Sequence, residues 1–214
     1  MRVFKLFLAV CAVSWSLSAA SYASIIVSVD MDLATAGIQN SATAQVGGTY
    51  TAGLFMQLTA DGNATTLGNY NYSVGFTNAN LRMTARTETS FGSLNPIDNS
   101  NPINNTTGRA LRFDGVDFGA GQLTPLGPVQ IGTVTFDVIG AGNSTITPGT
   151  FETAFDLFVA ANGITNLTNQ VVFNGGTLVT AVPEPTSVVL VGVGLVGLAL
   201  GRRRWKQRAS KTRV

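Results

Sequence analysis

Short runs of alternating apolar and polar residues, separated by turn-forming residues, constrain this chain more than any other feature. Between residues 24 and 181, apolar side chains recur at every second position, as at Ile25, Val27 and Val29. A period of two places alternate side chains on opposite faces of a β-strand, whereas a helix needs a period of about 3.6. Glycine, asparagine, threonine and proline fill the gaps between the runs, as is typical of turns. The body of the chain is therefore predicted to be all-β.

We expect one antiparallel β-sandwich of about eight to ten short strands, because two facing sheets can bury the apolar rows between them. Leu81, Met83 and Ala85 are expected to form one of the shorter inward rows. The expected core comprises Val27, Val29, Leu54, Met56, Tyr72, Val74, Val134, Phe136 and Val138.

Three segments outside these rows carry predictions of their own. Asn174-Gly175-Gly176 predicts a hairpin between residues 171–173 and 177–180, because both residues of an Asn-Gly pair accept positive φ. Residues 87–108 are rich in Asn, Ser, Pro and Thr and are expected to be a surface excursion. Residues 150–161 contain phenylalanines at helical spacing, so a short helix remains an alternative there.

The two ends of the chain carry the positive charge, and the body carries the negative charge. Residues 24–182 contain four arginines and ten acidic residues, so their net charge is −6, although the whole chain stands at +2. An acidic body repels phosphate groups, and the basic cluster at the C-terminus directly follows an apolar run. Nucleic acid is therefore excluded as a partner.

Residues 1–23 have the layout of a secretory signal peptide. Two basic residues precede an apolar stretch, and small residues stand at positions −3 and −1 of a cleavage point between Ala23 and Ser24. We expect signal peptidase to cut there; a site three residues earlier is an alternative. A transmembrane anchor is the competing interpretation, but the apolar run, residues 6–17, is shorter than the roughly 20 residues that span a bilayer.

The C-terminal segment, residues 182–214, has three parts. Pro183-Glu184-Pro185 comes first, an uncharged apolar run over residues 186–201 follows, and Arg202, Arg203 and Arg204 come next. The prolines keep the first part extended. The apolar run is expected to form a short transmembrane helix, roughly 24 Å long. The arginines are expected to stop transfer and to keep the C-terminal end in the cytoplasm.

This combination resembles the PEP-CTERM sorting signal, in which a Pro-Glu-Pro motif, a membrane segment and a basic cluster follow one another at the end of the chain. The resemblance covers about 25 residues. It implies an exosortase-type membrane protease as a partner and an envelope that often produces exopolysaccharide. It also implies that the protein is exported, is transiently anchored in the inner membrane, and then reaches the cell surface or extracellular matrix. A plain C-terminal membrane anchor is the alternative.

Few residues in the body can carry chemistry. The sequence contains no histidine, and its single cysteine, Cys11, lies in the predicted signal peptide. Disulfides, thiol catalysis and histidine-based catalysis or metal binding are therefore excluded from the mature chain. The acidic residues lack the spacing of a calcium loop, and we interpret them as solvated residues on strand faces. The candidates weighed were Asp30, Asp32, Asp114, Asp117, Asp137 and Asp156.

The body also resembles cohesin modules and the carbohydrate-binding domains related to them. The resemblance lies in the aromatic strand over residues 70–76, which runs through a short turn to Leu81, and in residues 130–138, which lead into Gly140. It implies a jelly-roll or cohesin-like sandwich over most of residues 25–180. Dockerin binding is not implied, because the chain contains neither a dockerin-like calcium loop nor a repeat of the domain.

The sequence thus predicts a signal peptide (1–23), a β-sandwich domain (24–181) and a sorting signal (182–214). We predict no catalytic, cofactor-binding or metal-binding residue and no cofactor. The expected function is that of a non-catalytic structural or adhesive module, associated with exopolysaccharide or another surface protein. A hydrolase that uses two carboxylates on extracellular glycan and a plain membrane-anchored binding protein are the alternatives. Phe91, Phe118 and Phe151 are the candidates for a sugar-stacking platform, which the absence of tryptophan from the body disfavours.

Overall fold

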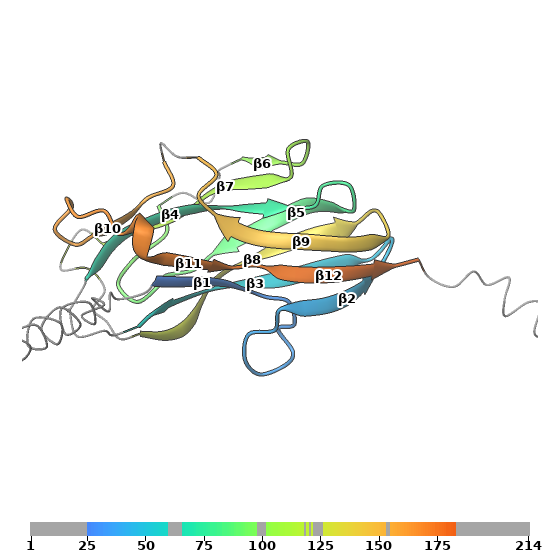
Figure 1. Ribbon diagram of the computed structural model, residues 1–214, viewed down its shortest axis with the longest axis horizontal. Coiled ribbons are helices and arrows are strands. Elements are labelled where there is room, and N and C mark those ends of the chain that lie inside the picture. The colour runs from blue at the N-terminus through green and yellow to red at the C-terminus, as the bar shows by residue number, and fades with distance from the viewer. Residues whose placement is uncertain are drawn as a thin grey trace, which may run out of the picture.

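The computed structural model describes residues 25–59, 66–97, 102–117, 119, 121, 126–152 and 155–182. These residues form two β-sheets that face each other (Figure 1). The first sheet has the order β11-β1-β3-β8-β5, and the second has the order β2-β12-β9-β4-β7-β6, with β10 paired to β4. The predicted sandwich is therefore confirmed.

The described residues form twelve strands, more than the eight to ten expected, and β3, β4 and β8 are longer than expected, with ten, ten and thirteen residues. A single 3-10 turn (Thr168–Gln170) accompanies them in the described residues. The first sheet comprises β1 (Ile25–Asp30), β3 (Thr49–Leu58), β5 (Leu81–Glu88), β8 (Leu126–Val138) and β11 (Val171–Asn174). The second sheet comprises β2 (Ser41–Gln45), β4 (Leu67–Phe76), β6 (Ile103–Asn104), β7 (Arg109–Val116), β9 (Gly142–Gly149), β10 (Phe158–Ala160) and β12 (Gly176–Ala181).

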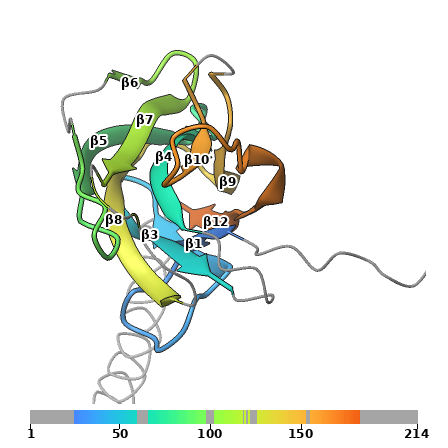
Figure 2. The same ribbon diagram turned by 90° about the vertical axis from the view of Figure 1, so that its left-hand side faces the viewer.

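The core lies between the two sheets, which Figure 2 shows end-on. All nine residues predicted for the core are at most 1% exposed. Aromatic rings from the second sheet form its centre, where Tyr72 stacks on Phe113 with their centroids 5.4 Å apart and lies 6.5 Å from Phe158. Rings of this size dominate the burial energy of a small domain, so these aromatic residues contribute strongly to holding the two sheets together.

The predicted hairpin around Asn174-Gly175-Gly176 is wrong. β11 and β12 lie in different sheets, where β11 runs parallel to β1 and β12 runs parallel to β2; the other strand pairs are antiparallel. The glycines serve the passage from one sheet to the other. A Cβ at Gly176 would lie 2.4 Å from the Sδ of Met31, and one at Gly175 would lie 2.9 Å from the carbonyl oxygen of Ile146. Close approach of the chain explains both glycines here.

The predicted inward row of β5 is wrong at Ala85, because a β-bulge interrupts the strand before that residue. The register of β5 against β8 shifts between Met83 and Ala85, so Ala85 is exposed while Leu81 and Met83 are buried. After the bulge, Arg86 and Glu88 take the inward positions, with side chains 3% and 2% exposed. A bulge adds one residue and reverses the facing of every residue after it, which strict alternation could not foresee.

The segment after β5 is more than a surface excursion. Residues 89–97 fold back on the sandwich, and Phe91 and Leu94 from this segment are completely buried. An isolated bridge between Asn95 and Val116 then joins the segment to the end of β7. The short helix considered for residues 150–161 is not found in the described part of that range, which contains β10 near its end. Residues 153 and 154 lie outside the described residues.

The described chain enters at one end of the sandwich, with β1, and leaves at the other, with β12 (Figure 1). Across residues 25–182, as far as they are described, no helix has the length and apolar character needed to cross a membrane. The predicted cleavage point at Ala23 and Ser24 lies outside the described residues, as do Pro183-Glu184-Pro185, the membrane segment and Arg202, Arg203 and Arg204.

Candidate functional site

The first candidate site is the junction at which the sandwich ends. β12 is held on both sides along most of its length, since it pairs with β9 as far as Thr180 and with β2 as far as Ala181, its last residue. The hydroxyl of Thr180 donates to the carbonyl oxygens of Gly140 (2.7 Å) and Gly142 (2.9 Å). The carbonyl of Ala181 accepts the N–H of Val46 at 2.9 Å. The next residue, Val182, is 64% exposed. The last described strand therefore ends at residue 181, shortly before the predicted sorting motif.

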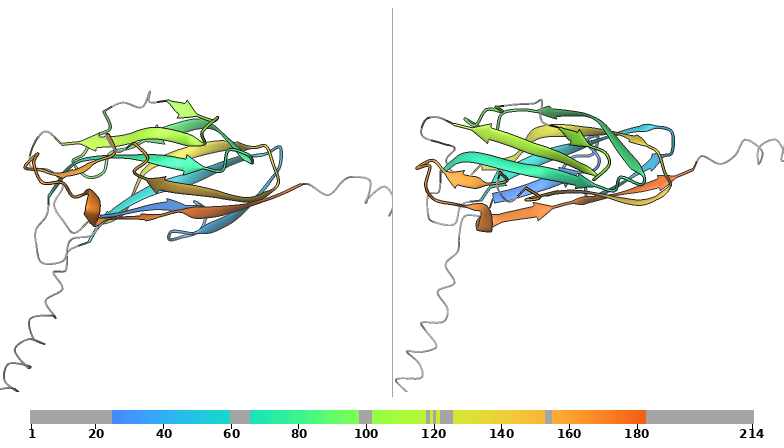
Figure 3. Two further views of the ribbon diagram at one scale, coloured as in Figure 1. Left: turned by 45° about the horizontal axis from the view of Figure 1, so that its top comes forward. Right: turned by 90° about the horizontal axis from the view of Figure 1, so that it is seen from above.

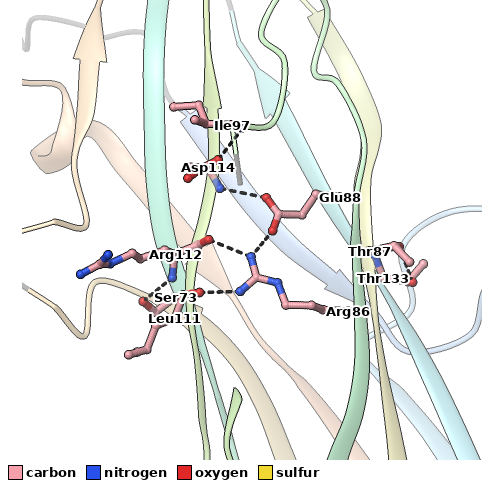
Figure 4. A network of polar contacts seen from close by, with 9 residues as sticks. All are labelled: Ser73, Arg86, Thr87, Glu88, Ile97, Leu111, Arg112, Asp114 and Thr133. Carbon is pink, nitrogen blue, oxygen red and sulfur yellow. Dashed lines mark hydrogen bonds and ion pairs between the residues drawn. The ribbon is translucent and has the colours of Figure 1, made fainter. Parts of the chain in front are cut away.

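The second candidate is a buried ion pair between Arg86 and Glu88, shown in Figure 4. Arg86 donates to the carbonyl oxygens of Leu111 and Arg112, the latter at 2.7 Å. Glu88 accepts the backbone N–H of Asp114 at 3.1 Å. The two side chains thus hydrogen-bond along the β7 backbone as a neighbouring strand would.

The position of this ion pair explains its hydrogen bonds. β6 pairs with β7 only at Arg109 and Ala110, and the N–H of Leu111 donates to the carbonyl oxygen of Pro102 at 3.3 Å, so the rest of β7 has no partner strand of its sheet on this edge; Figure 3 shows how short β6 is beside β7. An unpaired strand edge invites pairing with other chains and exposes unsatisfied backbone groups. Arg86 and Glu88 cover the middle of that edge, and the bridge between Asn95 and Val116 covers its end.

Burial is the largest influence on the pKa of Glu88 in this ion pair. Loss of solvent raises the pKa of Glu88, and the positive charge of Arg86 only partly opposes that rise. The guanidinium also lies over the ring of Phe113, 3.8 Å from its centroid. Two buried polar atoms at this place have no hydrogen-bond partner among the described residues: the hydroxyl oxygen of Tyr72, and Nε of the Arg86 guanidinium itself. Burial raises the pKa of Tyr72 as well. The enclosure of these groups is typical of a structural ion pair rather than a catalytic one.

The third candidate is a strap, described at residues 150–152 and 155–157, that lies on the outer face of the second sheet after β9. Asp156 anchors it, because its carboxylate accepts the hydroxyl of Ser73 (3.0 Å) and the N–H of Glu152 (2.7 Å). Burial raises the pKa of Asp156 above its ordinary value. Arg112 then contacts the strap through an ion pair with Glu152, with 3.3 Å between Nε and Oε2. The strap is therefore fixed to β4 and β7 by polar contacts.

A bulge in β7 directs Arg112 toward the strap. The register between β4 and β7 shifts between Tyr72 and Val74, and Arg112 adopts φ 57°, as the sole described non-glycine residue with positive φ. Such a conformation costs about 1–3 kcal/mol and persists only where the surroundings hold it. Here the N–H of Arg112 donates to the Ser73 hydroxyl at 3.4 Å while its carbonyl accepts from Arg86.

The acidic residues do not gather into a metal site. Among the described residues, no group of three or more acidic, histidine or cysteine side chains could hold a metal ion. Asp30 instead accepts the N–H groups of Asp32 and Gln39, both at 3.0 Å, and so closes the loop over residues 31–40. Asp32 accepts the hydroxyl of Thr35 at 2.7 Å, which lowers its pKa.

The interpretation of the acids as solvated residues is wrong for three of the six. Asp30, Asp114 and Asp156 are 3%, 7% and 2% exposed, and each accepts hydrogen bonds from backbone N–H groups. A buried carboxylate requires such partners. Spacing in the sequence gives no sign of them, because the donors lie in loops.

The aromatic candidates have different surroundings. Phe91 is completely buried in the core, so it cannot stack on a sugar. Phe151 lies on the strap and packs over two glycines, since Cβ atoms at Gly75 and Gly149 would lie 3.0 and 3.2 Å from its Cζ. Phe118 lies outside the described residues. Sequence reasoning missed Phe155, which is 51% exposed.

Two grooves flank the loop over residues 31–40. One, of about 460 Å³, lies between Tyr50, the start of β2 and Val179. The other, of about 580 Å³, lies between β1, β11 and Ile38. Asp32 contributes the sole carboxylate in the first lining, and the second lining contains none. Glycoside hydrolysis uses two carboxylates that flank the scissile bond, so neither groove has the residues for it.

Comparison with known proteins adds two findings at this point. Residues 181–204 match a protein family described as the PEP-CTERM protein-sorting motif, which confirms the resemblance found in the sequence. The motif indicates an exported protein that an exosortase processes. None of the curated proteins matches the chain.

Several solved structures share the sandwich. A non-cellulosomal cohesin from the hyperthermophilic archaeon Archaeoglobus fulgidus has a TM-score of 0.50 and 15% identity, over 78% of this chain and 96% of that chain. The third cohesin of ScaC from Acetivibrio cellulolyticus, in complex with the ScaB dockerin, has a TM-score of 0.49 and 13% identity, over 73% and 98%. A cohesin module of a Clostridium perfringens family 33 glycoside hydrolase has a TM-score of 0.48 and 12% identity, over 75% and 98%. At such identities the likeness shows the fold alone, which is a cohesin-like β-sandwich.

Proposed function

We propose that the protein is a non-catalytic structural or adhesive module that an exosortase delivers to the cell surface or extracellular matrix, where it is associated with exopolysaccharide or another surface protein. Signal peptidase cuts the chain between Ala23 and Ser24. The exosortase then recognises Pro183-Glu184-Pro185, while residues 186–201 cross the membrane and Arg202, Arg203 and Arg204 remain in the cytoplasm.

The single observation that carries this proposal is the match of residues 181–204 to the sorting motif, immediately after a completed fold. β12 makes its last backbone pairing at Ala181. A cut near Glu184 therefore leaves every described strand and every described core residue of the sandwich in place. Such a cut separates a complete domain from its membrane segment, which is what a sorting signal requires.

The sandwich also supports a binding role rather than a catalytic one. Its buried charged side chains form hydrogen bonds with backbone groups, as Arg86 and Glu88 do along β7. The neighbours with the same fold are cohesin modules, one of them solved in complex with a dockerin. We infer by analogy that the faces of this sandwich bind another macromolecule in the envelope.

A variant with Ala at residues 183–185 tests the sorting step. In cells that contain an active exosortase, we expect the parent chain to leave the membrane fraction and the variant to accumulate there uncut. Ile164→Ala, at a position that is 87% exposed and outside residues 181–204, is the control and is expected to behave like the parent. Equal release of all three chains would contradict the role of the motif.

A further inference from the structure

Two arginine–phenylalanine stacks lie side by side on the outer face of the second sheet. Arg109 lies over the ring of Phe151, with its Cζ 4.8 Å from the centroid, and Arg112 lies over Phe155 at 4.1 Å. Both arginines come from β7, and both phenylalanines come from the strap. Stacking on a ring fixes the plane of a guanidinium and leaves its edge available for hydrogen bonds.

The two stacks remain open to solvent in part. Phe155 is 51% exposed, and Leu157, at the end of the strap, is 37% exposed. Arg109 is exposed and has no acidic partner among the described residues. Arg112, in contrast, is paired with Glu152. The surface therefore combines an exposed aromatic face, an apolar neighbour and a cation that lacks a counter-charge.

This surface is less negative than the body as a whole. Residues 24–182 hold four arginines against ten acids, and two of the four arginines stand here on β7, opposite Glu152 and Asp156 of the strap. Elsewhere the acidic body repels an anionic polymer. The guanidinium of Arg109, which has no ion pair among the described residues, thus makes this face the more favourable place for such a polymer to make contact.

We propose that the outer face of the second sheet binds a polysaccharide that carries carboxylate groups, with Arg109 on a carboxylate and Phe155 against a sugar ring. A guanidinium matches a carboxylate as a bidentate donor. The bulge in β7 leaves Arg109 and Arg112 about two ladder positions apart, roughly 7 Å along the strand, and places both on the outer face. This inference rests on the proposed adhesive function and names the ligand class for it.

An acidic peptide is the less suitable occupant. Extended peptides bind sheets mainly by adding a strand to a free edge. β4 is paired on both sides, with β7 and with β9 and β10, and the middle of β7's free edge is covered by Arg86 and Glu88. The face itself offers rings and cations but no backbone to pair with, and a sugar polymer needs only these side chains.

The test measures binding of the full-length chain, purified in detergent, to polygalacturonate, to its methyl ester, to neutral dextran and to polyglutamate. We expect binding to polygalacturonate alone. Arg109→Gln should weaken it roughly ten-fold, the value of one charge-assisted hydrogen bond, and Arg109→Lys should weaken it less. Phe155→Ala should also weaken it, because it removes the aromatic face against which the sugar ring packs. Arg82→Gln is the matched control, because Arg82 is an exposed arginine on β5 of the other sheet, and it should have no effect.

Three results would overturn the proposal: no binding to polygalacturonate, equal binding by the Arg109 and Arg82 variants, or polyglutamate binding at least as tight. Melting curves of each variant establish that it is folded. We expect folded variants because Phe155 is 51% exposed and Arg109 lies at an exposed position of β7. Processing at the sorting motif is read separately by mass. A failure here therefore leaves the sorting function untouched and is distinguishable from a failure of sorting.

Discussion

Arg86 and Glu88 form an ion pair inside the sandwich and together hydrogen-bond to the free edge of β7 (Figure 4). They stand two residues apart on β5, at the edge of the facing sheet. The pair thus joins the edge strand β5 of one sheet to β7 of the other, where β6 is too short to cover β7. Closing such an edge prevents pairing with other chains.

Glu88→Gln should lower the free energy of unfolding by about 3–5 kcal/mol, because it leaves the guanidinium of Arg86 buried without a counter-charge. Urea denaturation of the two chains measures this difference. Glu152→Gln is the matched control. It breaks the ion pair with Arg112, whose side chains are 38% and 27% exposed, and a pair of that exposure contributes about 0–1 kcal/mol. Similar losses in both variants would contradict the structural role of Arg86 and Glu88.

The pH dependence of stability should differ in sign between two aspartates. Burial raises the pKa of Asp156 above its ordinary value of 3.8, so the folded state binds the proton more tightly than the unfolded state. The stability from Asp156 is then fully present below pH 3.8 and is lost as the pH rises through the folded pKa. The hydroxyl of Thr35 lowers the pKa of Asp32, so its contribution is present above pH 3.8 and is lost as the pH falls.

Urea denaturation at a series of pH values checks this prediction with two variants. Relative to Asp156→Asn, the parent chain should lose stability as the pH rises above 3.8. Relative to Asp32→Asn, it should lose stability as the pH falls below 3.8. Slopes of the same sign for both variants would show that one of these carboxylates has a different environment from the one described here.

Gly115→Ala should destabilise the fold by about 1–3 kcal/mol through overpacking. A Cβ at this position on β7 would lie 2.4 Å from Cε1 of Tyr70, whose ring is buried and 1% exposed. The ring cannot move without disturbing the aromatic core. Gly127→Ala is the control, because a Cβ at Gly127 meets nothing within 4 Å. Thermal melting should show a clear drop for the first variant and little change for the second.

Alternation along the strands was enough to predict the sandwich and its core, because burial in a two-sheet fold follows the period of two. It was not enough where the chain departs from regular pairing. Alternation places Ala85 in an inward row with Leu81 and Met83, but the bulge in β5 turns Arg86 inward instead. Asn174-Gly175-Gly176 indicated a hairpin, and the chain passes between sheets there. Bulges and crossings depend on the partner strand, which local sequence does not contain.

The candidate surface was also only partly visible in the sequence. Phe151 was considered as a sugar-stacking residue, but Phe155 was placed in a strand row, although it is half exposed beside Arg112. Neither arginine had been connected to an aromatic ring, because the strap returns to β4 and β7 from about 40 positions further along the chain. A contact of that range arises only in the folded molecule.

The most direct test of the central claim is the intact mass of the protein recovered from cells that contain an active exosortase. The account predicts a mature chain that begins near Ser24 and ends between Val182 and Pro185, so that the sandwich is complete and both terminal segments are lost. A mature form that keeps Arg202, Arg203 and Arg204 would contradict exosortase processing and would leave a plain membrane anchor as the function of the tail.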